Sequence, residues 1–214
     1  MVNPMSVIAK VRKLPVDFAI MLMMFYLILG ADFAFGENAA LMTNVLYMYM
    51  FMFVIARVTL PKVEKAQFPL GKAAMNFMAM FIVTAIVMLF LPSSVTALMA
   101  AGSFDASILF AVSFGVIYAL VKAYIEEDVF RNRISVVAGE KGQSVLFGLF
   151  HFFVLVTLFG FTATLIIPIA LLMILGLIWG IMQNRFGTLG STGSHFAYNA
   201  GILGILPRML GSVV

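Results

Sequence analysis

Long unbroken apolar runs occupy most of this chain and constrain its fold more than any other feature. A helix needs about 20 predominantly apolar residues to cross the hydrocarbon core of a bilayer. Runs of about that length are found at 15–35, 39–60, 73–92, 106–126, 143–160, 162–182 and 195–210. They lack the alternation over roughly ten residues that is typical of membrane β-strands. The sequence therefore predicts an all-α fold, a polytopic membrane helix bundle with about seven transmembrane helices.

The composition excludes several other classes of protein. Hydrophobic residues make up 64% of the 214 residues and charged residues only 10%, whereas soluble domains have roughly 25% charged residues. The chain has no Cys, which excludes a disulfide-stabilised secreted scaffold. The net charge is +4, but the Lys and Arg residues are spread between apolar runs and form no basic stripe. We therefore expect membrane lipid, and no nucleic acid, as a partner.

Basic residues predict the orientation of the bundle. Twelve of the 13 Lys and Arg residues lie on the side of the N-terminus, and Arg208 is the exception. Because cytoplasmic connections are enriched in Lys and Arg, we expect a cytoplasmic N-terminus in an inner or plasma membrane. The first run is expected to be a retained anchor helix. We expect one integral membrane domain over 1–214, with N-terminal helices in 1–105 and motif-bearing helices in 106–210.

Small residues predict how the last runs are connected. Gly160 lies between the fifth and sixth runs, which predicts a very short turn there. Gly187, Gly190 and Gly193 predict a flexible loop before the last run. Ser194 then has the position and the side chain of an N-cap for the last helix.

Three groups of polar residues lie in or beside the apolar runs of the second half. Ionisable groups are costly inside a bilayer, so each group is a functional hypothesis by default. The groups are Glu-Glu-x-x-x-Arg at 126–131, Phe-x-x-x-His at 147–151 and His-x-x-x-Asn at 195–199. The second and third groups contain the two His residues of the chain.

Helix geometry predicts different tasks for the paired glutamates. Glu127 and Arg131 are four residues apart, in the order that favours an ion pair on one helix face. Glu126 points about 100° away from Glu127, because an α-helix has 3.6 residues per turn. Glu126 is thus free to face a cavity, where it can act as a general base and share a water molecule with His151.

The last motif predicts a second half of the same site. His195 and Asn199 share a helix face and offer two hydrogen-bond donors to one developing negative charge. Each motif also has a simpler interpretation. Residues 126–128 could be an interfacial charge cluster, His151 a packing residue, and the His195–Asn199 pair a polar contact between membrane helices. The three motifs together, in this order, favour a functional site over those interpretations.

The three motifs resemble the signature motifs of the CPBP family. These intramembrane proteases are related to the CAAX prenyl endopeptidase and are also called the Abi family. The resemblance covers residues 120–205, and Asn132 stands where the family usually has Gly. It implies hydrolysis of a peptide bond in a membrane-associated peptide or a lipidated protein. The implied nucleophile is a water molecule activated by Glu126 with His151.

The same resemblance implies roles for the remaining motif residues. His195 and Asn199 would stabilise the oxyanion, and Glu127 and Arg131 would hold the catalytic glutamate in place. The resemblance favours a glutamate mechanism without metal or other cofactor.

Other mechanisms and functions stay open. Glu126, His151 and His195 could supply three zinc ligands and leave a fourth position for water. A non-catalytic membrane subunit or assembly factor with a membrane-protein partner is the main alternative to an enzyme. A small transporter that uses Glu126 and His151 as a proton relay is another. A solvated cavity joining the motifs favours hydrolysis, a partner covering it favours a subunit, and a pathway open to both faces favours transport.

Overall fold

The computed structural model describes residues 14–62, 68–89 and 108–202. In these ranges every element is helical and no strand is present, which confirms the predicted all-α class. The elements, in chain order, are α2 (Leu14–Phe35), the 3-10 turn η1 (Gly36–Asn38), α3 (Ala39–Thr59), α4 (Leu70–Leu89), α6 (Ile108–Glu126), the π-helix η2 (Glu127–Ile134), α7 (Ser135–Phe159), the 3-10 turn η3 (Ala163–Leu165) and α8 (Ile166–Ile202).

The apolar runs predict most of these helices to within a few residues. The first four runs correspond to α2, α3, α4 and α6, and the next two correspond to α7 and the first part of α8. Gly160, with φ 74°, ends α7 as expected and leads into the short turn before α8. The end of the last run, beyond 202, lies outside the described residues.

The predicted loop before the last run is wrong. Only Gly187 departs from helical geometry, with φ 77° and ψ 175°, and the chain is helical again up to Ile202. Gly193 serves close packing instead, because a Cβ there would lie 2.3 Å from the carbonyl oxygen of Phe77 on α4. Ser194 is inside the helix, and its hydroxyl pairs with that of Thr84 on α4 at 2.8 Å rather than capping a helix end.

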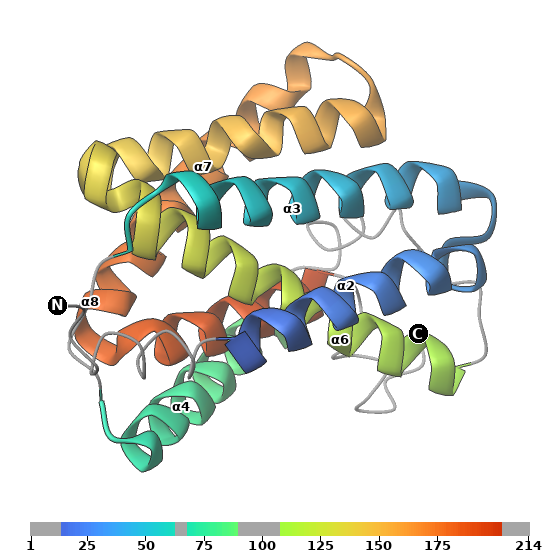
Figure 1. The fold of residues 1–214 in the computed structure, drawn as a ribbon. Helices are drawn as coiled ribbons and strands as arrows, with labels where there is room; N and C mark the ends of the chain where they lie inside the picture. The colour runs from blue at the N-terminus through green and yellow to red at the C-terminus, as the bar shows by residue number, and fades with distance from the viewer. Residues whose placement is uncertain (1–13, 63–67, 90–107, 203–214) are drawn as a thin grey trace, which may run out of the picture.

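The helices pack so that α6 and η2 lie at the centre of the bundle (Figure 1). Helices α2 and α3 form an antiparallel hairpin through η1, and α6 packs against α2 and α8. The π-helix contacts α3, α7 and α8, while α4 packs along α8. The α2–α3 turn and the α7–α8 turn lie towards the same end of the molecule (Figure 1). Helices that are distant in sequence therefore surround the segment that begins at Glu126.

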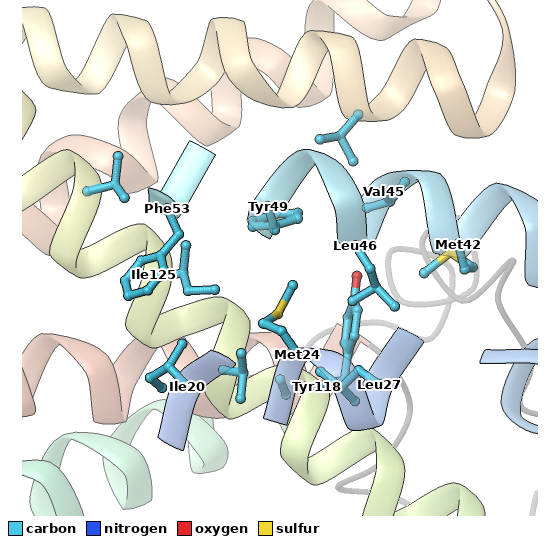
Figure 2. Close-up of a cluster of buried hydrophobic side chains, with 14 of the residues drawn as sticks. Ile20, Met24, Leu27, Met42, Val45, Leu46, Tyr49, Phe53, Tyr118 and Ile125 are labelled. Carbon is cyan, nitrogen blue, oxygen red and sulfur yellow. The ribbon is translucent and has the colours of Figure 1, made fainter. Parts of the chain in front are cut away.

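An apolar core joins α2, α3 and α6 beside that segment (Figure 2). Met24 and Leu27 of α2 meet Leu46 and Tyr49 of α3, with Tyr118 of α6 next to them, and each is at most 6% exposed. Close packing of such side chains holds the three helices together through many small van der Waals contacts. This core fixes the position of α3, and with it the position of Tyr49.

Four stretches of described helix are long and apolar enough to cross a membrane, by length and composition. They are Val16–Thr59, Leu70–Met88, Ser113–Phe159 and Ala163–Ile202. Large apolar side chains also cover the outside of the bundle, among them Leu29 at 76% exposed and Phe161 at 79%. An apolar surface of this extent is compatible with an integral membrane protein, because soluble monomers rarely expose one.

Candidate functional site

The first polar motif lies in the interior of the protein. Glu126 and Glu127 are 0% exposed, and Asp128 and Arg131 are 1% exposed. Glu126 ends α6, and the chain then widens into a π-helix over Glu127–Ile134. Such i→i+5 turns are rare and occur often at functional sites. The structure therefore places these charges inside the bundle, not on a solvated helix end.

Glu126 is the centre of the site, because side chains from four elements contact its carboxylate. On Oε2 it meets His195 Nε2 of α8 at 2.8 Å. On Oε1 it meets His151 Nε2 of α7 at 3.4 Å and Lys122 Nζ of its own helix at 3.4 Å. Tyr49 of α3 donates its hydroxyl hydrogen to the same oxygen. The predicted meeting of Glu126 with both His residues is present in the fold.

His195 bridges the two glutamates. Its Nε2 faces Glu126, and its Nδ1 lies 2.9 Å from Oε1 of Glu127. The Trp179 ring stacks on the imidazole, with centroids 3.7 Å apart and an interplanar angle of 13°. A neutral imidazole donates from one nitrogen only, so both contacts are hydrogen bonds when the ring or one carboxyl carries an additional proton.

Glu127 lies in the site beside Glu126 and contacts His195 in addition to Arg131, the partner predicted from the spacing. Both carboxylates reach the same His195 ring, one at each nitrogen. The predicted angle of about 100° between the two side chains used the 3.6 residues per turn of an α-helix, whereas the backbone from Glu127 onward is a π-helix.

A contact at Nδ1 fixes the orientation of the His151 ring. Its Nδ1 lies 2.9 Å from the carbonyl oxygen of Phe147, which can only accept a hydrogen bond. In the neutral ring, Nδ1 therefore carries the hydrogen and Nε2 is the acceptor. That acceptor lies 3.4 Å from the Tyr49 hydroxyl and 3.4 Å from Glu126. His151 is thus oriented to take a proton at Nε2.

Arg131 holds Glu127 and Phe147 in place beside the two His residues. The ion pair predicted from the sequence spacing is present, with Arg131 Nε 3.6 Å from Glu127 Oε1. Its guanidinium lies over the Phe147 ring at 4.2 Å, a favourable cation–π contact. Arg131 Nη2 also donates to the Gly176 carbonyl of α8 at 3.4 Å. Phe147, the first residue of the second motif, thereby packs between Arg131 and His151.

Asn199 has a different contact from the one expected. Its Nδ2 donates to the Ala119 carbonyl of α6 at 3.3 Å, one turn beyond His195 on α8. The two predicted donors therefore do not point at one acceptor in this structure. His195 contacts the carboxylates, and Asn199 ties α8 to α6.

Three residues of the site were not found from the sequence. Tyr49 and Trp179 lie in long apolar runs, and only the packing of separate helices brings them to Glu126 and His195. Lys122 lies in the run 106–126 but belongs to none of the three motifs. Its i, i+4 spacing to Glu126 was the available signal, since this spacing places both side chains on one helix face.

Asp128 links the π-helix to the end of α3. Its carboxylate contacts Arg57 Nε at 3.3 Å, Lys62 Nζ at 3.0 Å and Arg133 Nε at 3.0 Å. Arg133 Nη1 also donates to the Leu60 carbonyl at 2.9 Å, which satisfies an end group of α3. We call these four side chains the Asp128 clamp. The clamp holds the C-terminal end of α3 against η2.

Asn132, at the position where the CPBP family usually has Gly, is a buried polar link. Its Oδ1 accepts from Gln183 Nε2 and, at 3.2 Å, from Thr188 Oγ1. In the described part of the chain only glycines have positive φ, so Asn132 supplies no left-handed turn. It connects the π-helix to both sides of the break in α8 at Gly187.

Three of the four catalytic candidates, Glu126, His151 and His195, are in direct contact. Both His rings reach Glu126 by nitrogen–oxygen contacts of 2.8–3.4 Å. Among the described residues, no group of three or more His, Cys, Asp or Glu side chains is arranged to hold a metal ion. A small hollow beside the site is lined by Met24, Leu27, Leu46, Tyr49, Tyr118, Val121 and Lys122. Tyr49 and Lys122 separate this hollow from the carboxylate.

Comparison with known proteins adds no relative. No protein-family model, no curated protein and no solved structure matches this chain. The function is therefore argued from the site itself. A buried carboxylate with two imidazoles, one oriented as a proton acceptor and one bridging two acids, is suited to moving protons between a bound water and a substrate.

Proposed function

We propose that this chain is an intramembrane endopeptidase of the CPBP type, acting on a peptide bond of a membrane-associated or lipidated substrate. One observation carries the proposal. The fully buried Glu126 carboxylate contacts His151 and His195, and the three residues come from three separate helices. Buried ionisable groups in a membrane bundle are costly, and a catalytic role accounts for keeping them together.

In the proposed reaction, Glu126 with His151 takes a proton from water while the water oxygen bonds to the peptide carbonyl carbon. The carbon–nitrogen bond then breaks, and the proton passes to the leaving amine. His195 and Asn199 stabilise the oxyanion, which requires that His195 Nε2 leave the Glu126 carboxylate and that the Asn199 amide leave the Ala119 carbonyl. Glu127 holds His195 in register through the 2.9 Å contact at Nδ1.

We place this enzyme in an inner or plasma membrane with a cytoplasmic N-terminus. Seven crossings are proposed, by α2, α3, α4, α6, α7 and the two parts of α8. The break of α8 at Gly187 supports counting it twice. The exposed apolar surface supports a location in the membrane. The position of most Lys and Arg residues supports the orientation.

We also propose that the mechanism needs no metal. The resemblance of the three motifs to those of the CPBP family supports this, while Glu126, His151 and His195 are the residues that would hold zinc in the alternative mechanism. Chelator treatment of the purified protein is the test. Unchanged hydrolysis after EDTA is expected, whereas loss of hydrolysis that zinc restores would favour the metal mechanism.

The test of function uses the full chain in lipid vesicles with two fluorogenic probes, a prenylated peptide and an unlipidated apolar peptide. Glu126→Gln is expected to lower kcat by about 10²–10⁴-fold, as loss of a general base does. Glu37→Gln is the control, since Glu37 is exposed in the turn after α2. Hydrolysis that survives Glu126→Gln at the wild-type rate would contradict the proposal.

A non-catalytic subunit is the second candidate, and one observation favours it. The Tyr49 hydroxyl contacts both Glu126 and His151, the two groups between which the nucleophilic water must bind. A subunit has no need of space for that water. Absence of hydrolysis in the wild type, together with a membrane protein that co-purifies in stoichiometric amount, would favour this candidate.

A further inference from the structure

Glu126 and Glu127 have no exposed surface, yet each hydrolysed peptide bond consumes one water molecule. We infer that water reaches these carboxylates along a row of polar side chains between α7 and α8, from Glu140 through Gln143 and Arg131 to Glu127. We call this row the polar file. The use of this water rests on the proposed function, whereas the route itself rests on the contacts below.

The outer end of the polar file is at the surface. Glu140 is exposed, directly follows the break of α7 at Gly139, and accepts a hydrogen bond from Asn184 Nδ2 at 2.6 Å. The second carboxylate oxygen of Glu140, Oε2, lies near Gly180 of α8. A Cβ on Gly180 would lie 3.0 Å from Glu140 Oε2 and 3.1 Å from Gln143 Nε2, so both side chains converge on the bare backbone of that glycine.

The middle of the polar file is organised by one carbonyl group. The Gly176 oxygen accepts from Gln143 Nε2 at 3.1 Å and from Arg131 Nη2 at 3.4 Å. The sharing of one acceptor brings these two side chains next to each other, although they are 0% and 1% exposed. Gly176 and Gly180 are one helical turn apart, and their missing side chains leave room for the row on that face of α8.

The inner end of the polar file reaches the site. Arg131 Nε lies 3.6 Å from Glu127 Oε1, and that oxygen lies 2.9 Å from His195 Nδ1. His195 Nε2 then contacts Glu126 at 2.8 Å. A series of polar side chains therefore leads from the exposed carboxylate of Glu140 to the buried carboxylate of Glu126.

Unpaired polar atoms indicate that water belongs in the polar file. Four buried side-chain nitrogen or oxygen atoms of this row make no hydrogen bond to another described residue. These four are Glu127 Oε2, Arg131 Nε, Arg131 Nη1 and Gln143 Oε1. Buried polar groups are nearly always paired, by protein or by ordered water. Here donors of Arg131 lie between acceptors of its two neighbours, the pattern that bridging waters satisfy.

The opposite side of the site offers no comparable route. Beyond Tyr49 and Lys122, the hollow between α2, α3 and α6 is lined mainly by apolar side chains such as Met24 and Leu46 (Figure 2). Water gains no hydrogen bonds from such walls, so apolar cavities stay dry. The polar file is therefore the route that the described residues favour.

Hydroxyl-radical footprinting tests the route, because a short X-ray pulse oxidises side chains that lie next to bound water. Trp179 is the single Trp of the chain and is 2% exposed, and its ring lies 5.7 Å from Arg131 Cζ. We expect oxidation of Trp179 in the wild-type protein in lipid vesicles. Phe114, 0% exposed in the apolar core, is the internal reference and should stay unmodified.

Two variants close the polar file in different ways. Gly180→Val places methyl groups where Glu140 and Gln143 converge, and Gln143→Met replaces the amide by an apolar chain of similar length. Both are expected to reduce Trp179 oxidation several-fold. Gly71→Val is the matched control, since no described atom lies within 4 Å of a Cβ there. If Gly180→Val fails to fold, Gln143→Met alone carries the test.

The outcomes separate the route from the function. Unmodified Trp179 in the wild type, or full oxidation in both variants, overturns the route. Loss of oxidation in the variants supports the route even if the wild type hydrolyses no peptide, in which case the proposed function fails alone. Conversely, if the wild type hydrolyses the peptide while Trp179 oxidation is unchanged in both variants, the proposed function stands and the route is overturned.

Discussion

The contacts of Tyr49 make it the residue whose replacement separates stability from activity. Its hydroxyl donates to the Glu126 carboxylate and lies 3.4 Å from His151 Nε2. A water molecule that bridges these two groups needs the same position. Tyr49 therefore stabilises the buried charge and, in the proposed reaction, excludes the nucleophilic water.

Tyr49→Phe should lower stability and raise the rate of hydrolysis. Loss of a hydrogen bond to a charged group costs about 1.5–3 kcal/mol of unfolding free energy, while the space released near Glu126 can hold the water. Thermal unfolding in detergent and kcat on the fluorogenic peptides measure the two effects. A lower kcat would instead assign the Tyr49 hydroxyl a positive part in the reaction.

At the residue scale, the sequence predicted contacts among the charged motif residues but not the aromatic side chains that also contact them. Spacing was sufficient for Glu127 with Arg131, because both lie on neighbouring turns of one helix. The contact of Glu126 with His151 and His195 was expected from the motifs taken together. Tyr49 and Trp179 gave no such signal, since aromatic residues are frequent in apolar runs and their contacts depend on how separate helices pack.

At the element scale, two glycines break helices in the same way. Gly139 in α7 has φ 72° and ψ 176°, and Gly187 in α8 has φ 77° and ψ 175°. Only glycine adopts this backbone conformation without strain. Each break changes the direction of the helix that follows it. Asn132 contacts Thr188 beside the break at Gly187, and the Glu140–Asn184 hydrogen bond lies beside the break at Gly139.

Gly139→Ala should destabilise the protein by about 1–3 kcal/mol, the cost of holding a non-glycine residue in this region. No described atom lies within 4 Å of a Cβ at Gly139, so the cost comes from the backbone and not from a clash. Gly71→Ala is the control, because its Cβ is equally free and its φ is not positive. Equal unfolding temperatures for the two variants would contradict the explanation.

Helix positions were predictable because apolar runs of membrane length have few alternatives. Glycine was harder to interpret. The same residue type breaks α8 at Gly187 and allows close packing on α4 at Gly193. A single sequence does not distinguish these uses, because they differ only in what lies opposite the missing side chain. The π-helix at η2 was also missed, since no pattern of residue types separates it from an α-helix.

At the scale of the whole molecule, the orientation in the membrane can be tested directly because the chain has no Cys. Glu37 lies in the exposed α2–α3 turn, and exposed Lys141 follows the break of α7 near the other end of the bundle. In intact cells a membrane-impermeable thiol reagent should label Glu37→Cys. Lys141→Cys should react only after the membrane is opened. The reverse labelling pattern would contradict a cytoplasmic N-terminus.

The Asp128 clamp gives α3 one fixed end. Arg57 and Lys62, at the end of α3 and just beyond it, are held by Asp128, and Arg133 is bonded to the carbonyl of Leu60. Tyr49 lies eight residues before Arg57, which is about 12 Å along a helix with a 1.5 Å rise per residue. The apolar core holds the same helix around Leu46 and Tyr49. Because α3 is held at two places about 12 Å apart, the Tyr49 hydroxyl has a defined position relative to Glu126, and a loss of the Asp128 ion pairs would be felt at the site through α3.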